Sequence, residues 1–225
     1  MTRGSYQCGP RRPRECARRR SKAIEGLAAV ALCLSFLSGC GGGSSAQASS
    51  SAAQSEFAGA ALRPVASAPP LALRNYLGDH VNLDHYRGKA VLVTFLYTHC
   101  IDVCPVIAAN LAVALDHLGP QAHTVQIIAV SVDARGDNRR TVAAFLRAHH
   151  MTGRMKYLIG TASELRPVWK AWHVAAVRDP TSRTLVTHSS VTYGVSATGK
   201  LMTLYGPTFE PAQIVHDIPK LLNSQ

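Results

Sequence analysis

Two nearly continuous apolar runs, separated by a helical pattern, constrain the fold of this chain more than any other feature of its sequence. Residues 90–97 (AVLVTFLY) and 125–132 (VQIIAVSV) are rich in β-branched and aromatic side chains, as in strands that are covered on both faces. Between them, residues 105–118 carry apolar side chains at helical spacing, and Gly119 and Pro120 then mark the helix end. A strand–helix–strand unit of this kind predicts parallel strands joined by a right-handed crossover.

Further periodic segments surround this unit. Helices are predicted at residues 138–151, 163–172 and 211–222, strands at 157–159, 190–195 and 200–205, and a small hairpin or edge strand at 76–83. The last two strands are joined by a short turn that contains Gly199, so they are expected to add an antiparallel hairpin. The predicted class is α/β, with a central mixed sheet flanked by helices, and the order of elements is that of a thioredoxin-like fold.

The N-terminus has the pattern of an export signal. A basic region that ends at Lys22 precedes an apolar run at residues 27–37, which is shorter than the about 20 apolar residues of a membrane-spanning helix. Residues 37–40 (LSGC) resemble a bacterial lipobox, in which the cysteine is lipidated and becomes the mature N-terminus. We therefore predict a lipoprotein signal peptide at residues 1–39 and lipidation of Cys40. The alternative is an ordinary cleaved signal beside an incidental cysteine.

A polar stretch of low complexity follows Cys40. Residues 40–63 are mostly small or polar and carry almost no charge, so this segment is predicted to be a flexible tether with a reach of roughly 30 Å. The folded domain is predicted to occupy residues 64–225. The expected product is an exported lipoprotein, anchored to a membrane and facing the periplasm or the cell exterior.

The positive charge of the chain lies largely in the predicted signal peptide. The formal net charge is +11, but eight of the 24 Lys and Arg residues precede residue 23. From Cys40 onward the chain has 16 basic and 11 acidic residues, and the basic ones are scattered rather than gathered in a stripe. Nucleic-acid binding, which needs such a stripe, is therefore not expected.

Two cysteines remain in the predicted mature domain, and they lie close together. Residues 100–105 (CIDVCP) follow the first buried strand and open the first helix, at the sheet edge where sites of α/β proteins gather. Pro105 suits the first helical position, which puts Cys104 at or near the N-cap, where the helix dipole favours a thiolate. A disulfide that closes so short a loop would stabilise the fold little. Copper binding by soft thiolates and dithiol redox chemistry are therefore the two functional interpretations.

Three segments are similar to the Sco/SenC family. They are residues 97–105 (YTHCIDVCP), 130–133 (VSVD) and 188–190 (HSS), within a similarity that extends over about residues 65–222. The resemblance implies a thioredoxin-like fold in which Cys100, Cys104 and His188 bind copper. It also implies that the protein delivers copper to the binuclear copper site of cytochrome c oxidase, or reduces the cysteines of that site. Ile101 stands where the family usually has proline, which affects copper affinity or redox potential rather than the set of ligands.

Neighbouring polar residues each allow two interpretations. Asp102 is expected either to cap the helix or to orient a cysteine. Asp133 is expected either to hold the metal ligands in place without binding the metal itself or to form a turn. His99 adjoins Cys100, but neighbours on an extended segment point to opposite faces, so His99 is not expected to be a ligand.

Two functions of different classes follow from these residues. The first is a copper metallochaperone, not a classical enzyme, whose partner is the copper subunit of cytochrome c oxidase or another copper protein. The second is a membrane-anchored thiol–disulfide oxidoreductase that acts on partner cysteines, with a thiol reductase as a further partner. His188 distinguishes them, because copper binding needs it and dithiol exchange does not. A peroxidase is disfavoured, since no arginine adjoins Cys100 or Cys104 in the sequence.

Overall fold

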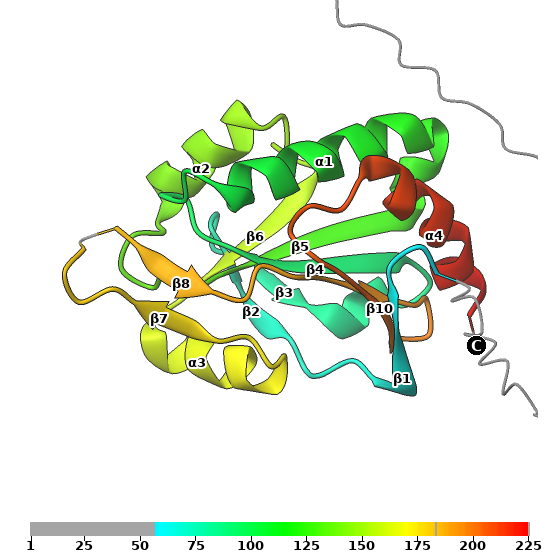
Figure 1. Cartoon of the computed structure of the whole chain (residues 1–225), viewed down its shortest axis with the longest axis horizontal. Coiled ribbons are helices and arrows are strands. Elements are labelled where there is room, and N and C mark those ends of the chain that lie inside the picture. The colour runs from blue at the N-terminus through cyan, green and yellow to red at the C-terminus, as the bar shows by residue number, and fades with distance from the viewer. Residues whose placement is uncertain (1–56, 183, 225) are drawn as a thin grey trace, which may run out of the picture. The chain divides into compact units, whose positions relative to one another are not determined.

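An eight-stranded mixed sheet forms the centre of the part of the chain that the structure, a computed structural model, describes: residues 57–182 and 184–224. Across the sheet, the strands follow the order β1 (Ala60–Ser67), β10 (Lys200–Tyr205), β9 (Thr192–Val195), β4 (Ala90–Leu96), β5 (Val125–Ser131), β6 (Met155–Ile159), β2 (Ala72–Asn75) and β3 (His80–Asn82) (Figure 1). Strands β4, β5 and β6 pair in parallel, whereas β9 pairs antiparallel with both β4 and β10. The predicted parallel unit with an added antiparallel hairpin is confirmed.

Helices cover both faces of this sheet. α1 (Val103–Leu118), α2 (Arg139–Ala148) and α4 (Pro211–Asn223) lie on one face, and α3 (Ala162–Ala171) lies on the other (Figure 1). The short 3₁₀ turns η1 (Leu83–Tyr86) and η2 (Gly119–Thr124) follow β3 and α1. α1 joins β4 to β5 and α2 joins β5 to β6, so two right-handed crossovers in the same direction place both helices on the same face.

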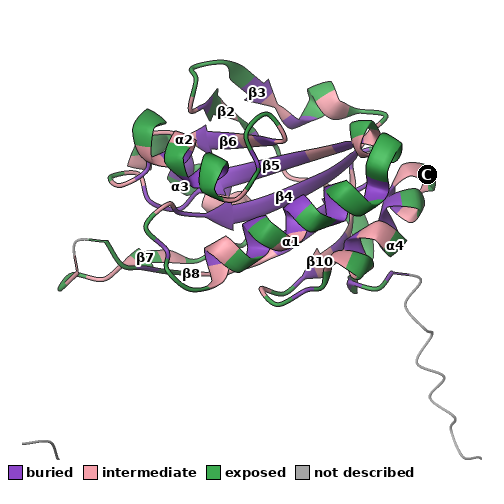
Figure 2. Ribbon diagram, turned by 90° about the horizontal axis from the view of Figure 1, so that it is seen from above, coloured by how far each residue is buried: buried purple, intermediate pink, exposed green. Residues whose placement is uncertain are grey.

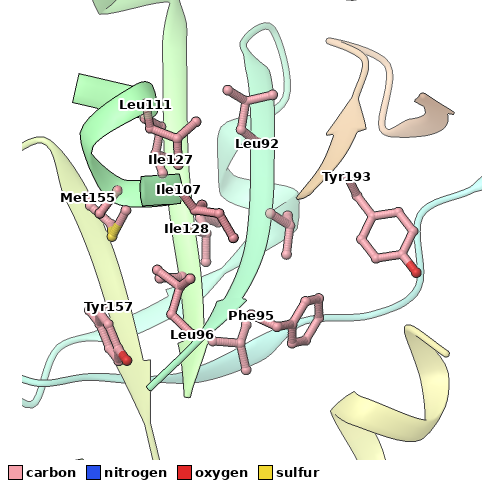
Figure 3. Packing of buried hydrophobic residues seen from close by; sticks show 14 of the residues in the cluster. Leu92, Phe95, Leu96, Ile107, Leu111, Ile127, Ile128, Met155, Tyr157 and Tyr193 are labelled. Atoms are coloured by element: carbon pink, nitrogen blue, oxygen red, sulfur yellow. The ribbon is translucent and has the colours of Figure 1, made fainter. Parts of the chain in front are cut away.

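The apolar runs form strands because side chains from both layers of helices cover them. All seven residues of β4 are buried (Figure 2). On one face, Ile107 and Leu111 of α1 lie next to Ile127 of β5, and all three are almost fully buried (Figure 3). On the other face, the ring of Trp172 packs against Phe95 and Tyr193, with ring centroids 6.1 and 5.4 Å away. The predicted α/β class with a central mixed sheet is confirmed.

α1 begins two residues earlier than the position of Pro105 predicts. Its first residue is Val103 and its N-cap is Asp102, so Pro105 is the third residue of the helix. Proline is tolerated there because the N–H groups of the first turn have no partner within the helix, and the missing N–H costs no hydrogen bond. By length and composition, Val103–Thr124 is the one helix of the described residues that could cross a membrane. In this domain its apolar side is buried in the core.

The folded domain also begins before residue 64. β1 starts at Ala60, inside the segment predicted to be tether, and pairs with β10. The buried carboxylate of Asp217 in α4 accepts the backbone N–H groups of Ala58 and Gly59, at 2.8 and 3.0 Å. Pairing with distant residues therefore orders a segment whose composition alone predicts no ordered structure. The predicted signal peptide, Cys40 and the tether up to residue 56 lie outside the described residues.

A small antiparallel hairpin stands apart from the main sheet. It consists of β7 (Ala176–Arg178) and β8 (Val186–His188), with Ala176 opposite His188 (Figure 1). The sequence shows only a turn-rich stretch here, because three-residue strands leave no detectable alternation of apolar and polar side chains. The following strand, expected from residue 190, begins at Thr192. The hairpin is important because its last residue is the predicted copper ligand His188.

Candidate metal and thiol site

The two cysteines lie where β4 passes into α1. Cys100 is on the connecting loop and Cys104 is the second residue of α1; both are free thiols and both are buried. The backbone N–H of Cys104 donates to the sulfur of Cys100 over 3.4 Å, and the backbone N–H of Asp102 donates to the same sulfur. Unpaired N–H groups at the start of the helix therefore converge on Cys100.

The pKa values of the two thiols are shifted in opposite directions. The hydrogen bond from the Cys104 side chain, with further help from backbone N–H groups, lowers the pKa of Cys100 to about 5 despite its burial. The pKa of Cys104 is raised, first because it donates to Cys100 and then because it is itself buried. At neutral pH the pair thus holds one proton, on Cys104. The prediction that the helix start favours a thiolate at Cys104 is wrong, because the sulfur in front of the N–H groups is that of Cys100.

His188 faces this pair from the hairpin. Its Nε2 lies 3.8 Å from the sulfur of Cys104, and its Nδ1 lies 3.1 Å from the carbonyl oxygen of Ser189. A carbonyl only accepts, so Nδ1 carries the proton and Nε2 presents its lone pair to the thiols. Burial lowers the pKa of His188, which keeps the imidazole neutral and able to act as a ligand.

Tyr97, which sequence reasoning did not single out, connects the hairpin with the thiol loop. Its ring meets the ring of His188 edge-on, with centroids 5.5 Å apart. Its hydroxyl donates to Cys100 and accepts the backbone N–H of Val186 in β8. The signal in the sequence was its position at the end of the buried strand, where a tyrosine needs a polar partner for its hydroxyl.

Asp137 is a second residue whose role the sequence did not reveal. The neighbouring Asn138, at the start of the predicted helix 138–151, is the N-cap of α2. Asp137 is buried instead, and its carboxylate accepts hydrogen bonds of 2.7–2.9 Å from the backbone N–H and hydroxyl of Thr98 and from the hydroxyls of Ser131 and Tyr157. Thr98 follows β4 and precedes the thiol loop, Ser131 is the last residue of β5, and Tyr157 lies within β6.

The remaining predicted residues lie around the cysteines. Asp102 occupies the N-cap, but its side chain makes no capping hydrogen bond, so only its backbone acts on Cys100. Asp133 is buried; its Oδ1 accepts the backbone N–H groups of Arg135 and Gly136 and pairs with Arg178. Its role as support for copper ligands stays a prediction. His99 is exposed and lies next to Gly136: a Cβ atom added to Gly136 would be 3.0 Å from the Nδ1 of His99.

Cys100, Cys104 and His188 offer two sulfur donors and one nitrogen donor. Within residues 57–182 and 184–224, no three His, Cys, Asp or Glu side chains already surround a common point that could hold one. Cys104 contacts both Cys100 and His188, so the three predicted ligands are adjacent but are not closed around a centre. Two thiols and a neutral imidazole fit Cu(I) in type, because soft sulfur ligands select this ion over oxygen-seeking cations.

Fold and site together define a thioredoxin-like domain with two thiols at the start of its first helix and a histidine facing them. The SCO1/SenC family model matches residues 61–223. The chain therefore belongs to the SCO1/SenC family, and the predicted family is confirmed.

Known relatives agree with this assignment. The chain is 30% identical to protein SenC of Rhodobacter capsulatus over 157 residues, which are 69% of this chain and 70% of SenC. It is 27% identical to the SCO1 protein homolog of Bacillus subtilis over 138 residues, 60% of this chain and 72% of the relative. The apo Sco1 structure from Thermus thermophilus superposes with a TM-score of 0.64 at 30% identity, covering 75% of this chain and 99% of that one. The copper-bound ScoI of Bradyrhizobium japonicum gives 0.62 at 25% identity, with 69% and 99% covered.

Proposed function

We propose that this protein is a copper metallochaperone that carries Cu(I) on Cys100, Cys104 and His188. The observation that carries the proposal is the orientation of His188: its Nδ1 is engaged by Ser189, and its Nε2 lies 3.8 Å from the sulfur of Cys104. A histidine that only filled space would not need its free lone pair directed at a thiol. Solved relatives such as the ScoI of Bradyrhizobium japonicum are described with copper bound, which supports copper as the cargo.

The protonation states of the three proposed ligands suit reversible binding of Cu(I). Cys100 is a thiolate at neutral pH and can receive Cu(I) without losing a proton, whereas Cys104 must release its proton when it becomes a ligand. His188 is already neutral and loses none. Copper binding therefore releases about one proton near pH 7, and protonation of Cys104 favours the return of copper to a partner.

The loop between the cysteines is open to a partner. Ile101, which stands between the two cysteines, is 96% exposed, although the thiols themselves are buried. A copper protein can approach this loop and exchange its own ligands for those of the chaperone. We propose the copper subunit of cytochrome c oxidase, or another copper protein, as the acceptor, in line with the family resemblance of the sequence.

The N-terminal sequence supports export and anchoring. We propose that residues 1–39 are removed as a lipoprotein signal peptide and that Cys40 is lipidated, which places the domain outside the cytoplasmic membrane on a tether. Radiolabelled palmitate incorporation tests this step, and Cys40→Ser should abolish the label.

A Cu(I) titration of the reduced protein, in competition with a chromogenic chelator, tests the ligand set. We expect one tight equivalent, and we expect Cys100→Ala, Cys104→Ala and His188→Ala each to weaken it by at least about tenfold. His117→Ala is the matched control, because His117 is exposed at the far end of α1. Unchanged affinity in the His188 variant would remove it from the ligand set and end the three-ligand proposal.

A thiol–disulfide oxidoreductase is the second candidate. The low pKa of Cys100, about 5, favours it, because a thiolate attacks a partner disulfide. Cys104, held against Cys100, would then resolve the mixed disulfide. An insulin- or partner-reduction assay separates the candidates: His188→Ala should retain dithiol exchange while it loses copper.

A further inference from the structure

A basic pocket is lined by residues of α3 and of β7, the first strand of the β7–β8 hairpin. Figure 1 shows the position of these elements. The pocket has a volume of about 300 Å³ and is also lined by the loop after β5. A second hollow of about 500 Å³ adjoins it and shares Arg135 and Arg178. Neither cysteine nor His188 lines either cavity, so the pocket is separate from the thiol site.

The charge of this pocket is positive. Three arginines line it, Arg135, Arg166 and Arg178, against one carboxylate, that of Asp133. Asp133 is engaged at its Oδ1 by the ion pair with Arg178 and by two backbone N–H groups, whereas its buried Oδ2 has no hydrogen-bond partner in the described part of the chain. In the described part of the chain, the guanidinium groups of Arg135 and Arg166 have neither an ion pair nor a hydrogen bond. Two arginines therefore remain to receive an anion, and a carboxylate can take two parallel N–H donors from each.

Part of the pocket wall is apolar. Trp169 lines it, and a hydrogen bond of 2.9 Å from its indole N–H to the carbonyl of Ser131 holds the ring in place. Alanine and proline side chains, including Ala162, Ala176 and Pro180, complete the lining. A fixed aromatic wall next to arginines suits the flat part of an organic molecule and not a bare inorganic ion.

We propose that this pocket binds a small organic carboxylate, with the carboxylate on Arg135 and Arg166 and the apolar part against Trp169. None of the three proposed copper ligands lines the pocket, so this proposal extends the proposed function rather than depending on it. Its size is at the lower limit of ligand pockets, which restricts the ligand to a compact molecule.

Benzoate and inorganic phosphate are the probes that test this proposal on the full protein, by calorimetry and by tryptophan fluorescence. Benzoate is expected to bind saturably and several-fold more tightly than phosphate, and to change the emission of Trp169. Arg166→Gln and Arg135→Gln are each expected to weaken benzoate binding about tenfold, through loss of a charge-assisted pair. Arg147→Gln, on the exposed side of α2, makes the same charge change elsewhere and is expected to have no effect.

Three results would overturn the proposal. Absence of saturable benzoate binding would show that the pocket takes no small carboxylate. Phosphate binding as tight as benzoate would show that only charge acts there. An equal loss of affinity in the Arg147 and Arg166 variants would place the effect in the net charge of the protein and not in this pocket.

Discussion

The two thiols of this site show how position within one turn of helix sets the chemistry of a residue. Cys100 and Cys104 are the same residue type and are four positions apart, yet only Cys100 lies in front of the free N–H groups of α1. Its thiolate receives hydrogen bonds from those groups, from Cys104 and from Tyr97. Cys104 is fully buried and serves as a donor, so its proton is retained.

Alkylation of the reduced protein by iodoacetamide should therefore modify Cys100 first. The pKa of Cys100 is lowered to about 5, so the thiolate is present above that value and is lost as the pH falls through it. We expect the rate at Cys100 to be nearly constant from about pH 9 to pH 6 and to fall by half near pH 5, because only the thiolate is a nucleophile. Peptide mapping by mass spectrometry at each pH measures this. An inflection near pH 8.5, or equal labelling of both cysteines, would contradict the assignment.

At the scale of elements, one carboxylate joins three parallel strands. Asp137 accepts hydrogen bonds from residues at the ends of β4 and β5 and from Tyr157 in β6. Each of these strands ends at the edge of the sheet that carries the thiol loop. Because Thr98 is only two residues before Cys100, the position of the loop depends on this contact.

Asp137→Ala should lower the free energy of unfolding by about 3 kcal/mol or more, since several buried donors lose their acceptor at roughly 1–3 kcal/mol each. Urea denaturation measures the change. Asp116→Ala is the matched control: this aspartate is two-thirds exposed and pairs with Arg154 at the surface, so its loss should cost at most about 1 kcal/mol. Equal effects of the two substitutions would show that Asp137 does not hold the strand ends.

At the scale of the whole molecule, the N-terminal and C-terminal segments of the described chain contact each other. β1 lies at one edge of the sheet, and α4 is the last helix. Asp217 of α4 is fully buried and accepts hydrogen bonds from Ala58, Gly59 and the hydroxyl of Tyr205, 2.7 Å away. The segment that enters the domain is thereby fixed to its C-terminal helix.

Asp217→Ala should weaken the contact between α4 and the segment that precedes β1. We expect faster amide hydrogen exchange at Ala58, Gly59 and β1, and an unfolding free energy lower by roughly 2–4 kcal/mol, from buried donors left unpaired. His216→Ala removes the half-exposed donor to the same carboxylate and should change neither quantity much. Unaltered exchange at β1 in the Asp217 variant would show that strand pairing alone holds the segment.

Much of the fold could be predicted from the sequence because its signals are local. The buried runs of β4 and β5, the helical spacing of α1 and the final hairpin each follow from periodicity within a few turns or residues. Elements held by distant partners could not be predicted in this way. β1 depends on pairing with β10, and the hairpin β7–β8 is too short to show a pattern.

The sequence by itself determined the class of fold, the family and the presence of two thiols between a buried strand and a helix, because these depend on spacing along the chain. Only the tertiary structure decided which thiol keeps the proton and that His188 faces Cys104, 84 positions earlier in the chain. It also assigned roles to Tyr97 and Asp137. The physical reason is that proton affinity and ligand orientation depend on burial and on hydrogen bonds between distant segments, which come together only when the sheet has formed.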